Sequence, residues 1–100
     1  MDPRTSELQS LLTTFAPNVY FQPPESVKLK FPCITYSINP GWVRHANNNL
    51  YTRRRSYTVT YIHRDPGTET VNRIEELPYC SYDRRFAKDN LYHDVFELYY

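Results

Sequence analysis

The chain has 100 residues and a formal net charge of +1, because 12 Lys and Arg nearly balance 11 Asp and Glu. This length corresponds to one domain, and the near-neutral charge excludes a global field that would hold nucleic acid or an anionic membrane. No apolar run approaches the roughly 18 residues of a membrane span. The chain opens on an amphipathic segment instead of a signal peptide, so we expect a soluble domain that is not secreted through a cleaved signal.

Aromatic side chains are abundant, with 10 Tyr, 5 Phe and 1 Trp. Tyrosine favours strands, but its hydroxyl also needs a hydrogen-bond partner. A domain of this size with few aliphatic residues has a thin core, so we interpret the tyrosines as favouring surfaces that another chain covers. The cysteines, Cys33 and Cys80, form no metal-binding or redox motif, and we expect both to be free thiols in strands.

The first predicted element is a helix that Asp2 caps and that has Pro3 in its first position. Its apolar residues recur on one stripe, formed by Leu8, Leu11, Leu12 and Phe15. Pro17 ends this helix. Residues 18–29 contain Pro23-Pro24 and no clean period, and we predict an ordered loop there.

Strand patterns follow in the middle of the chain. Residues 31–39 alternate between two faces and predict a strand, after which Pro40-Gly41 turns the chain. The segment 42–49 ends in three asparagines, which tolerate left-handed backbone conformations and predict a projecting loop or hairpin tip. Residues 50–64 form the longest predicted strand, and Asp65-Pro66-Gly67 ends it.

The C-terminal third combines a short helix with two strands. Thr68 is the expected cap of a helix that carries Val71 and Ile74, and Pro78 ends it. The strands 79–87 and 91–100 follow, joined at a polar turn. The order α-β-β-α-β-β predicts a single α+β domain over residues 1–100, with one mostly antiparallel sheet of four to five strands and two helices packed on one face. The side chains expected beneath the helices are Ile34, Tyr36, Ile38, Val59, Tyr61, Phe96 and Leu98.

Reactive groups show no catalytic or ligand-binding pattern. The three histidines have no metal-ligand spacing. Glu75 and Glu76 are adjacent on a helix and therefore do not face each other. With only 2 Gly, the chain has no phosphate-binding glycine loop. We expect no enzymatic activity, no metal and no cofactor.

Basic and aromatic residues raise nucleic-acid binding as an alternative. Arg53–Arg55 lie between Tyr51 and Tyr57, and Arg84-Arg85 lie between Tyr82 and Phe86, as on strands that stack bases. Strand alternation, however, places neighbouring arginines on opposite faces. It assigns Arg84 to the face of Cys80, Tyr82 and Phe86, where its charge must pair with a carboxylate or reach a subunit boundary. It assigns Arg85 to the face of Ser81 and Asp83, which is the solvated or lumen-facing side. The candidate partner interface comprises Trp42, Arg44, Asn47, Asn48, Asn49, Arg53, Arg54, Tyr82, Arg84 and Tyr99.

Four segments carry a resemblance to a known family. They are residues 30–37 (KFPCITYS), 44–48 (RHANN), 57–66 (YTVTYIHRDP) and 77–96, which begins with LPYCSYDR and ends with NLYHDVF. Together they cover about residues 30–100. They resemble the tail terminators of long-tailed bacteriophages, also called tail-completion or head–tail joining proteins.

This resemblance implies a structural virion protein of the tail or neck, assembled in the cytoplasm of the bacterial host. Its α/β subunit forms a hexameric ring, a homo-oligomer, that caps the tail tube protein, stops tube growth and offers a docking surface to the head–tail connector or stopper protein. DNA passes through the lumen without specific binding, and no membrane is involved. The open alternatives are another phage neck or head-completion protein and a small α/β nucleic-acid-binding domain.

Overall fold

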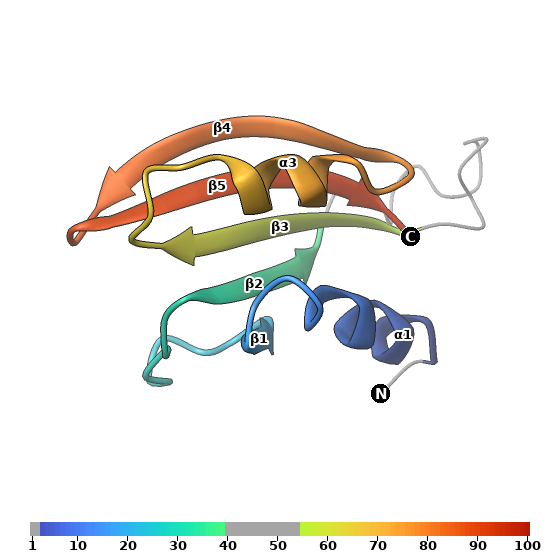
Figure 1. The fold of residues 1–100 in the computed structure, drawn as a ribbon. Helices are drawn as coiled ribbons and strands as arrows, with labels where there is room; N and C mark the ends of the chain where they lie inside the picture. Colours follow the sequence, from blue (N-terminus) through green and yellow to red (C-terminus); the bar gives the residue numbers. More distant parts are fainter. Residues whose placement is uncertain (1–2, 40–54) are drawn as a thin grey trace.

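The computed structural model describes residues 3–39 and 55–100 (Figure 1). The predicted cap Asp2, the turn at Pro40-Gly41, the Asn-rich loop and the beginning of the predicted strand 50–64 lie outside these residues. The elements of the described part are α1 (Pro3–Leu12), β1 (Asn18–Phe21), β2 (Cys33–Ile38), β3 (Ser56–His63), α3 (Glu69–Glu75), β4 (Cys80–Lys88) and β5 (Leu91–Tyr99).

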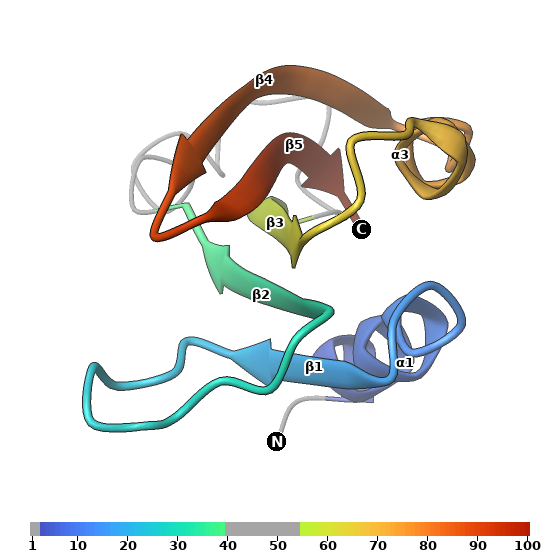
Figure 2. The same ribbon diagram turned by 60° about the vertical axis from the view of Figure 1, so that its left-hand side comes forward.

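The strands form one five-stranded mixed sheet in the order β1-β2-β3-β5-β4. β1 pairs with β2 in parallel, and the other neighbours pair in antiparallel fashion. Both helices lie on the same side of the sheet (Figure 2). We call this side the helix face and the other side the open face. The predicted α+β class, the mostly antiparallel sheet and the two helices are therefore confirmed.

The order of elements differs from the prediction by one strand, because residues 18–21 form β1 instead of belonging to a loop. Four residues are too few to show a clear alternation. In the structure, Val19 and Phe21 pack against the core, and parallel pairing with β2 fixes them there. The remaining chain before β2 is the connection that a parallel pair of strands requires.

The main core lies between the helix face and the two helices. Leu8 and Leu12 of α1 and Val71 and Ile74 of α3 are buried in it, and Leu11 and Phe15 pack on it half-buried. Of the strand residues predicted here, Ile34, Tyr36, Val59, Tyr61, Phe96 and Leu98 are buried, and Ile38 packs against them. The predicted helix-facing pattern is thus confirmed.

Three tyrosines supplement the thin aliphatic core. Tyr36, Tyr57 and Tyr61 are buried. The Tyr36 hydroxyl donates to Gln9 Oε1 at 2.6 Å, and the Tyr57 hydroxyl lies 3.4 Å from Thr5 Oγ1, so α1 provides polar partners at both positions. A buried tyrosine with a satisfied hydroxyl contributes its ring to the core without a desolvation penalty. Tyr36 and Tyr61 were predicted beneath the helices, whereas at Tyr57 the interpretation of tyrosines as partner-facing residues is wrong.

The ends of the elements follow local signals. Thr68 precedes α3 as expected, but its side chain makes no capping hydrogen bond. Asp89 and Asn90 both have positive φ, 55° and 63°, between β4 and β5. This conformation matches the two-residue hairpin turn that fits the twist of antiparallel strands, and Asp and Asn tolerate it well. Within the described residues, neither helix is long and apolar enough to cross a membrane.

Candidate functional site: the Asp94 cluster and the edges of the sheet

One extra residue in the edge strand β4 determines on which face of the sheet the following side chains lie. Tyr82 pairs with Phe96 and Arg84 pairs with Val95, so Asp83 has no counterpart on β5 and forms a bulge. Beyond the bulge the alternation is reversed. Arg85 therefore joins Tyr82 on the helix face, whereas Arg84 shares the open face with Phe86.

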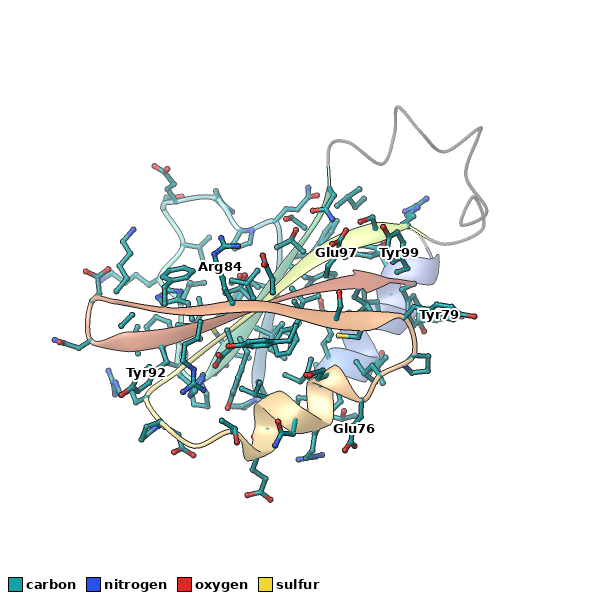
Figure 3. All side chains as sticks on the ribbon, turned by 90° about the horizontal axis from the view of Figure 1, so that it is seen from above. Glu76, Tyr79, Arg84, Tyr92, Glu97 and Tyr99 are labelled. Atoms are coloured by element: carbon teal, nitrogen blue, oxygen red, sulfur yellow. The ribbon has the colours of Figure 1, made fainter. Side chains whose placement is uncertain are left out.

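The predicted faces of the two arginines are consequently wrong. Strict alternation assigned Arg84 to the face of Tyr82 and Arg85 to the solvated face. In the structure, Arg84 is exposed, pairs with its neighbour Asp83 at 2.5 Å and lies 5.7 Å from the centroid of Phe86. Figure 3 shows the β4 edge with Arg84 on the side away from α3. Arg85 instead reaches Asp94.

Asp94 is the centre of a buried polar cluster on the helix face, with 0% of its surface exposed. Arg85 donates to both of its oxygens, from Nε to Oδ1 at 2.7 Å and from Nη2 to Oδ2 at 3.1 Å. The Tyr82 hydroxyl donates to Oδ1 at 2.8 Å, and His63 Nε2 lies 2.6 Å from Oδ2. A carboxylate is stable in such a site because each oxygen accepts charge-assisted or short hydrogen bonds. We call these four residues the Asp94 cluster.

The same cluster holds the loop between β3 and α3. Arg85 donates to the carbonyl oxygens of Pro66 at 3.0 Å and Gly67 at 3.2 Å. The backbone N–H of Asp65 donates to His63 Nδ1 at 3.2 Å. Because Nδ1 accepts this hydrogen bond, Nε2 is the ring nitrogen that faces Asp94 as a donor. The cluster thus joins β3, β4, β5 and the loop that leads into α3.

Aromatic rings enclose the cluster. Tyr61 stacks on the His63 ring with centroids 4.3 Å apart, and the Arg85 guanidinium lies 5.1 Å from the centroid of Tyr92. Tyr82 meets Phe96 edge-on at 5.4 Å. These contacts restrict the side chains that hydrogen-bond to Asp94, so the geometry of the cluster is fixed from several sides.

The electrostatics of the cluster follow from this geometry. Burial acts to raise the pKa of Asp94, but the hydrogen bonds from Arg85, His63 and Tyr82 outweigh it and hold that pKa below 3.8. The hydrogen bond to Asp94 raises the pKa of Arg85. Burial, and then the hydrogen bond to the Asp94 carboxylate, raise the pKa of Tyr82. The ion pair is therefore fully formed at neutral pH.

This arrangement suits a structural role, in which the cluster holds the strands and the loop together. A general base needs a free nitrogen or oxygen within reach of a substrate, whereas both ring nitrogens of His63 and both oxygens of Asp94 are engaged. Among the described residues, no group of three His, Cys, Asp or Glu side chains is placed to hold a metal ion. The Asp94 cluster fixes the shape of the sheet edge beside it.

The two thiols take no part in this site. Cys33 is buried on the open face and Cys80 half-buried on the helix face, and both are free, as expected. Burial raises the pKa of each thiol to about 11, with a further contribution from Glu75 at Cys80. A thiol that stays protonated at neutral pH is a poor nucleophile and a poor metal ligand.

Most of the exposed large apolar side chains lie at the β4 edge of the sheet. These are Tyr79, Tyr82 and Phe86, the last two 38% exposed. Phe86 also stacks on His93, with centroids 4.7 Å apart. Of the other two, Val27 lies in the connection between β1 and β2 beside β1, whereas Phe31 lies next to Tyr61, His63 and Arg64 at the end of β3. In the described part of the chain, no other large hydrophobic side chain is exposed to this extent.

An apolar groove of about 450 Å³ runs along β1. It is lined by Gln9, Val19, Tyr20, Phe21, Pro23, Pro24 and Val27. Gln9 comes from α1 on the helix face, whereas Tyr20 points to the open face, so the groove crosses the outer edge of the sheet. The domain therefore has one edge with protruding aromatic rings and another with an apolar hollow.

The predicted interface residues are only partly within the described chain. Tyr82 and Arg84 lie on β4, and Tyr99 lies half-exposed near the end of β5. Trp42, Arg44, Asn47, Asn48, Asn49, Arg53 and Arg54 lie outside the described residues. Tyr57, proposed as a base-stacking residue, is fully buried and cannot stack on a base.

Local sequence patterns do not bring His63, Arg85 and Asp94 together as a unit. One signal was available: an aspartate at the centre of the strand 91–100, on the face that it shares with Tyr92 and Phe96, needs a buried cation. The bulge that brings Arg85 to this aspartate has no comparable signal in the sequence.

Comparisons with protein-family models, with curated proteins and with solved structures find no match to this chain.

Proposed function

We propose that the chain is a structural subunit of a phage neck, a tail terminator that forms a ring at the head-proximal end of the tail tube. The proposal combines the sequence resemblance with one structural observation: exposed aromatic side chains lie along the β4 edge of the sheet, whereas an apolar groove follows the opposite, β1 edge. A head-to-tail contact between different surfaces closes into a ring when the rotation between subunits allows it. The two edges are suited to such a contact.

The proposed partners follow from that role. One end of the ring contacts the tail tube protein and the other contacts the connector or stopper of the head, while DNA crosses the lumen. A lumen that passes DNA must not bind it tightly, and the near-neutral net charge of +1 suits this requirement. In this role the Asp94 cluster is a structural element, and the protein has no enzymatic activity.

Electron microscopy of purified protein mixed with tail tubes from the same phage tests this role. We expect a ring at one end of each tube and no ring along its side. A Phe86→Ala variant, which removes an exposed aromatic side chain from the β4 edge, should no longer form protein rings on the tubes while its far-UV circular dichroism is retained. Protein that binds heads but never tubes would identify another neck component and refute the terminator role.

Nucleic-acid binding is the alternative that one observation favours, namely the exposed stack of Phe86 on His93 beside Arg84. The arginines of this strand argue against it, because Arg84 pairs with Asp83 and Arg85 pairs with Asp94. A gel shift with single- and double-stranded DNA and RNA at ~0.15 M salt separates the two functions, since phosphate contacts weaken steeply with salt. We expect no shift, and a shift abolished by Phe86→Ala would favour the nucleic-acid function.

A further inference from the structure

The two edge strands run in opposite directions. β1 is parallel to β2, and each of the following pairs, β2 with β3, β3 with β5 and β5 with β4, is antiparallel. Subunits related by rotation about an axis along the strands keep their strand directions. When two such copies meet edge to edge, β4 of one therefore lies antiparallel to β1 of the next. Antiparallel pairing is also the slightly more stable arrangement.

The register across the sheet shows which residues of the two edges lie at the same level. We call a set of residues that pair from strand to strand across the whole sheet a row. One row on the open face runs from Asn18 through Cys33, Ile62 and His93 to Phe86. The row that begins at Tyr20 ends at Arg84, again on the open face. The row that begins at Phe21 ends at Tyr82, on the helix face. Copies placed side by side at equal height thus bring Phe86 to Asn18, Arg84 to Tyr20 and Tyr82 to Phe21.

Residues that lie at the same level of the two edges have complementary side chains. The exposed side of the Tyr82 ring meets the apolar groove beside Phe21, and Arg84 meets the face of Tyr20, a favourable cation–π pair. The carbonyl of Val19 already accepts from Gln9, so side chains, more than a continuous series of backbone hydrogen bonds, carry the contact.

The contact is small. β1 has four residues, so one such junction covers much less than the roughly 800 Å² per partner of a stable standard interface. A single junction is then weak in solution, and it becomes stable only when every subunit of a ring makes it twice or when a tail tube holds the subunits together.

From these observations we propose that β4 of one copy docks antiparallel against the β1 edge of a second copy, with Tyr82 and Arg84 in the groove lined by Val19, Tyr20 and Phe21. This inference rests on the proposed ring and specifies the surfaces that close it. The occupant of the apolar groove is thus a second copy of the chain.

Disulfide trapping tests this contact even when it is transient. The matched pair is Asn18→Cys with Phe86→Cys, in a background in which Cys33 and Cys80 are replaced by alanine because Asn18 lies directly beside Cys33 in the register. The new thiols cannot bond within one chain, since four strand spacings of about 4.8 Å separate them and a disulfide requires Cα atoms within about 7 Å. Mild oxidation should therefore give a series of dimers, trimers and larger species on a non-reducing gel.

The control pair is Asn18→Cys with Ser81→Cys. Ser81 lies on the same strand and the same open face, but in the register its row falls four residues away from Asn18, about 13 Å along the strand. We expect at least a tenfold lower yield of cross-linked species from this pair. A second matched pair, Tyr20→Cys with Arg84→Cys, should repeat the result, and all variants are compared by thermal melting before oxidation.

Equal yields from matched and control pairs, or no cross-linked species from either matched pair, would overturn the proposed contact. The same samples mixed with tail tubes separate this inference from the proposed function. Rings on tube ends without cross-links from the matched pairs would support the terminator function but refute the proposed contact. Matched cross-links in protein that never binds tubes would support the contact and refute the terminator function.

Discussion

Arg84 and Arg85 are neighbours in sequence with different environments. The Arg84 side chain is 60% exposed and pairs with Asp83, whereas the Arg85 side chain is 25% exposed and pairs with the fully buried Asp94. Exposed ion pairs contribute about 0–1 kcal/mol to stability, but breaking a buried pair costs about 3–5 kcal/mol because one charge is left without compensation. The two positions therefore form a matched test of the Asp94 cluster.

We expect Arg85→Glu to lower the free energy of unfolding by about 3–5 kcal/mol, a large fraction of a small domain's stability. Arg84→Glu should change it by less than about 1 kcal/mol. Urea denaturation followed by circular dichroism measures both. Equal and small losses would show that Asp94 does not depend on Arg85.

The pH dependence of stability should report the same cluster. A carboxylate whose pKa is lower in the folded state stabilises the fold above its unfolded pKa, and that contribution is lost as pH falls through the folded pKa. The Asp94 pKa lies below its usual 3.8, so we expect stability to decline as pH falls below about 4. Asp94→Asn should be less stable at pH 7 and should show a shallower decline. An unchanged slope in this variant would assign the acid sensitivity to other carboxyl groups.

At the scale of elements, the β4 bulge is the feature with the largest consequences. Tyr82 and Arg84 pair with adjacent residues of β5, so removing Asp83 would leave the register on both sides of the bulge unchanged. We therefore expect deletion of Asp83 to retain the fold and the Asp94 cluster, with a loss of about 1 kcal/mol or less, in the range of an ordinary surface change.

Deletion of Ala87 is the control, because no extra residue near it can absorb the loss and the turn at Asp89 and Asn90 would be pulled out of register. Thermal melting of both deletion variants measures the difference. A deletion of Asp83 that unfolds the domain as fully as deletion of Ala87 would contradict the assigned bulge.

The helices, four of the strands and the core follow from sequence because their signals are periodic. The stripe of α1 and the alternation in β2, β3 and β5 recur over enough residues to determine which face is buried. β1 was missed because it is short and pairs in parallel with β2. The faces of Arg84 and Arg85 were missed because a bulge depends on the partner strand, and no local pattern around Asp83 marks it.

At the scale of the whole molecule, the unlike edges and the small contact they can make predict weak association. We expect multi-angle light scattering at micromolar concentration to show mainly monomer. A terminator subunit that assembles only on a finished tube needs this weak association in solution, because rings that closed early would compete with the tube end for subunits. A dilution-resistant hexamer would contradict this timing, although not the ring itself.

The proposed role of the protein in ending tail growth is tested most directly by tail length. Tails are measured by negative-stain electron microscopy after infection with phage that carries an early stop codon in this gene, with and without the gene supplied from a plasmid. We expect overlong tails without heads in its absence, and normal tails joined to heads when it is supplied. Tails of normal length, joined to heads, in the absence of the protein would contradict the account.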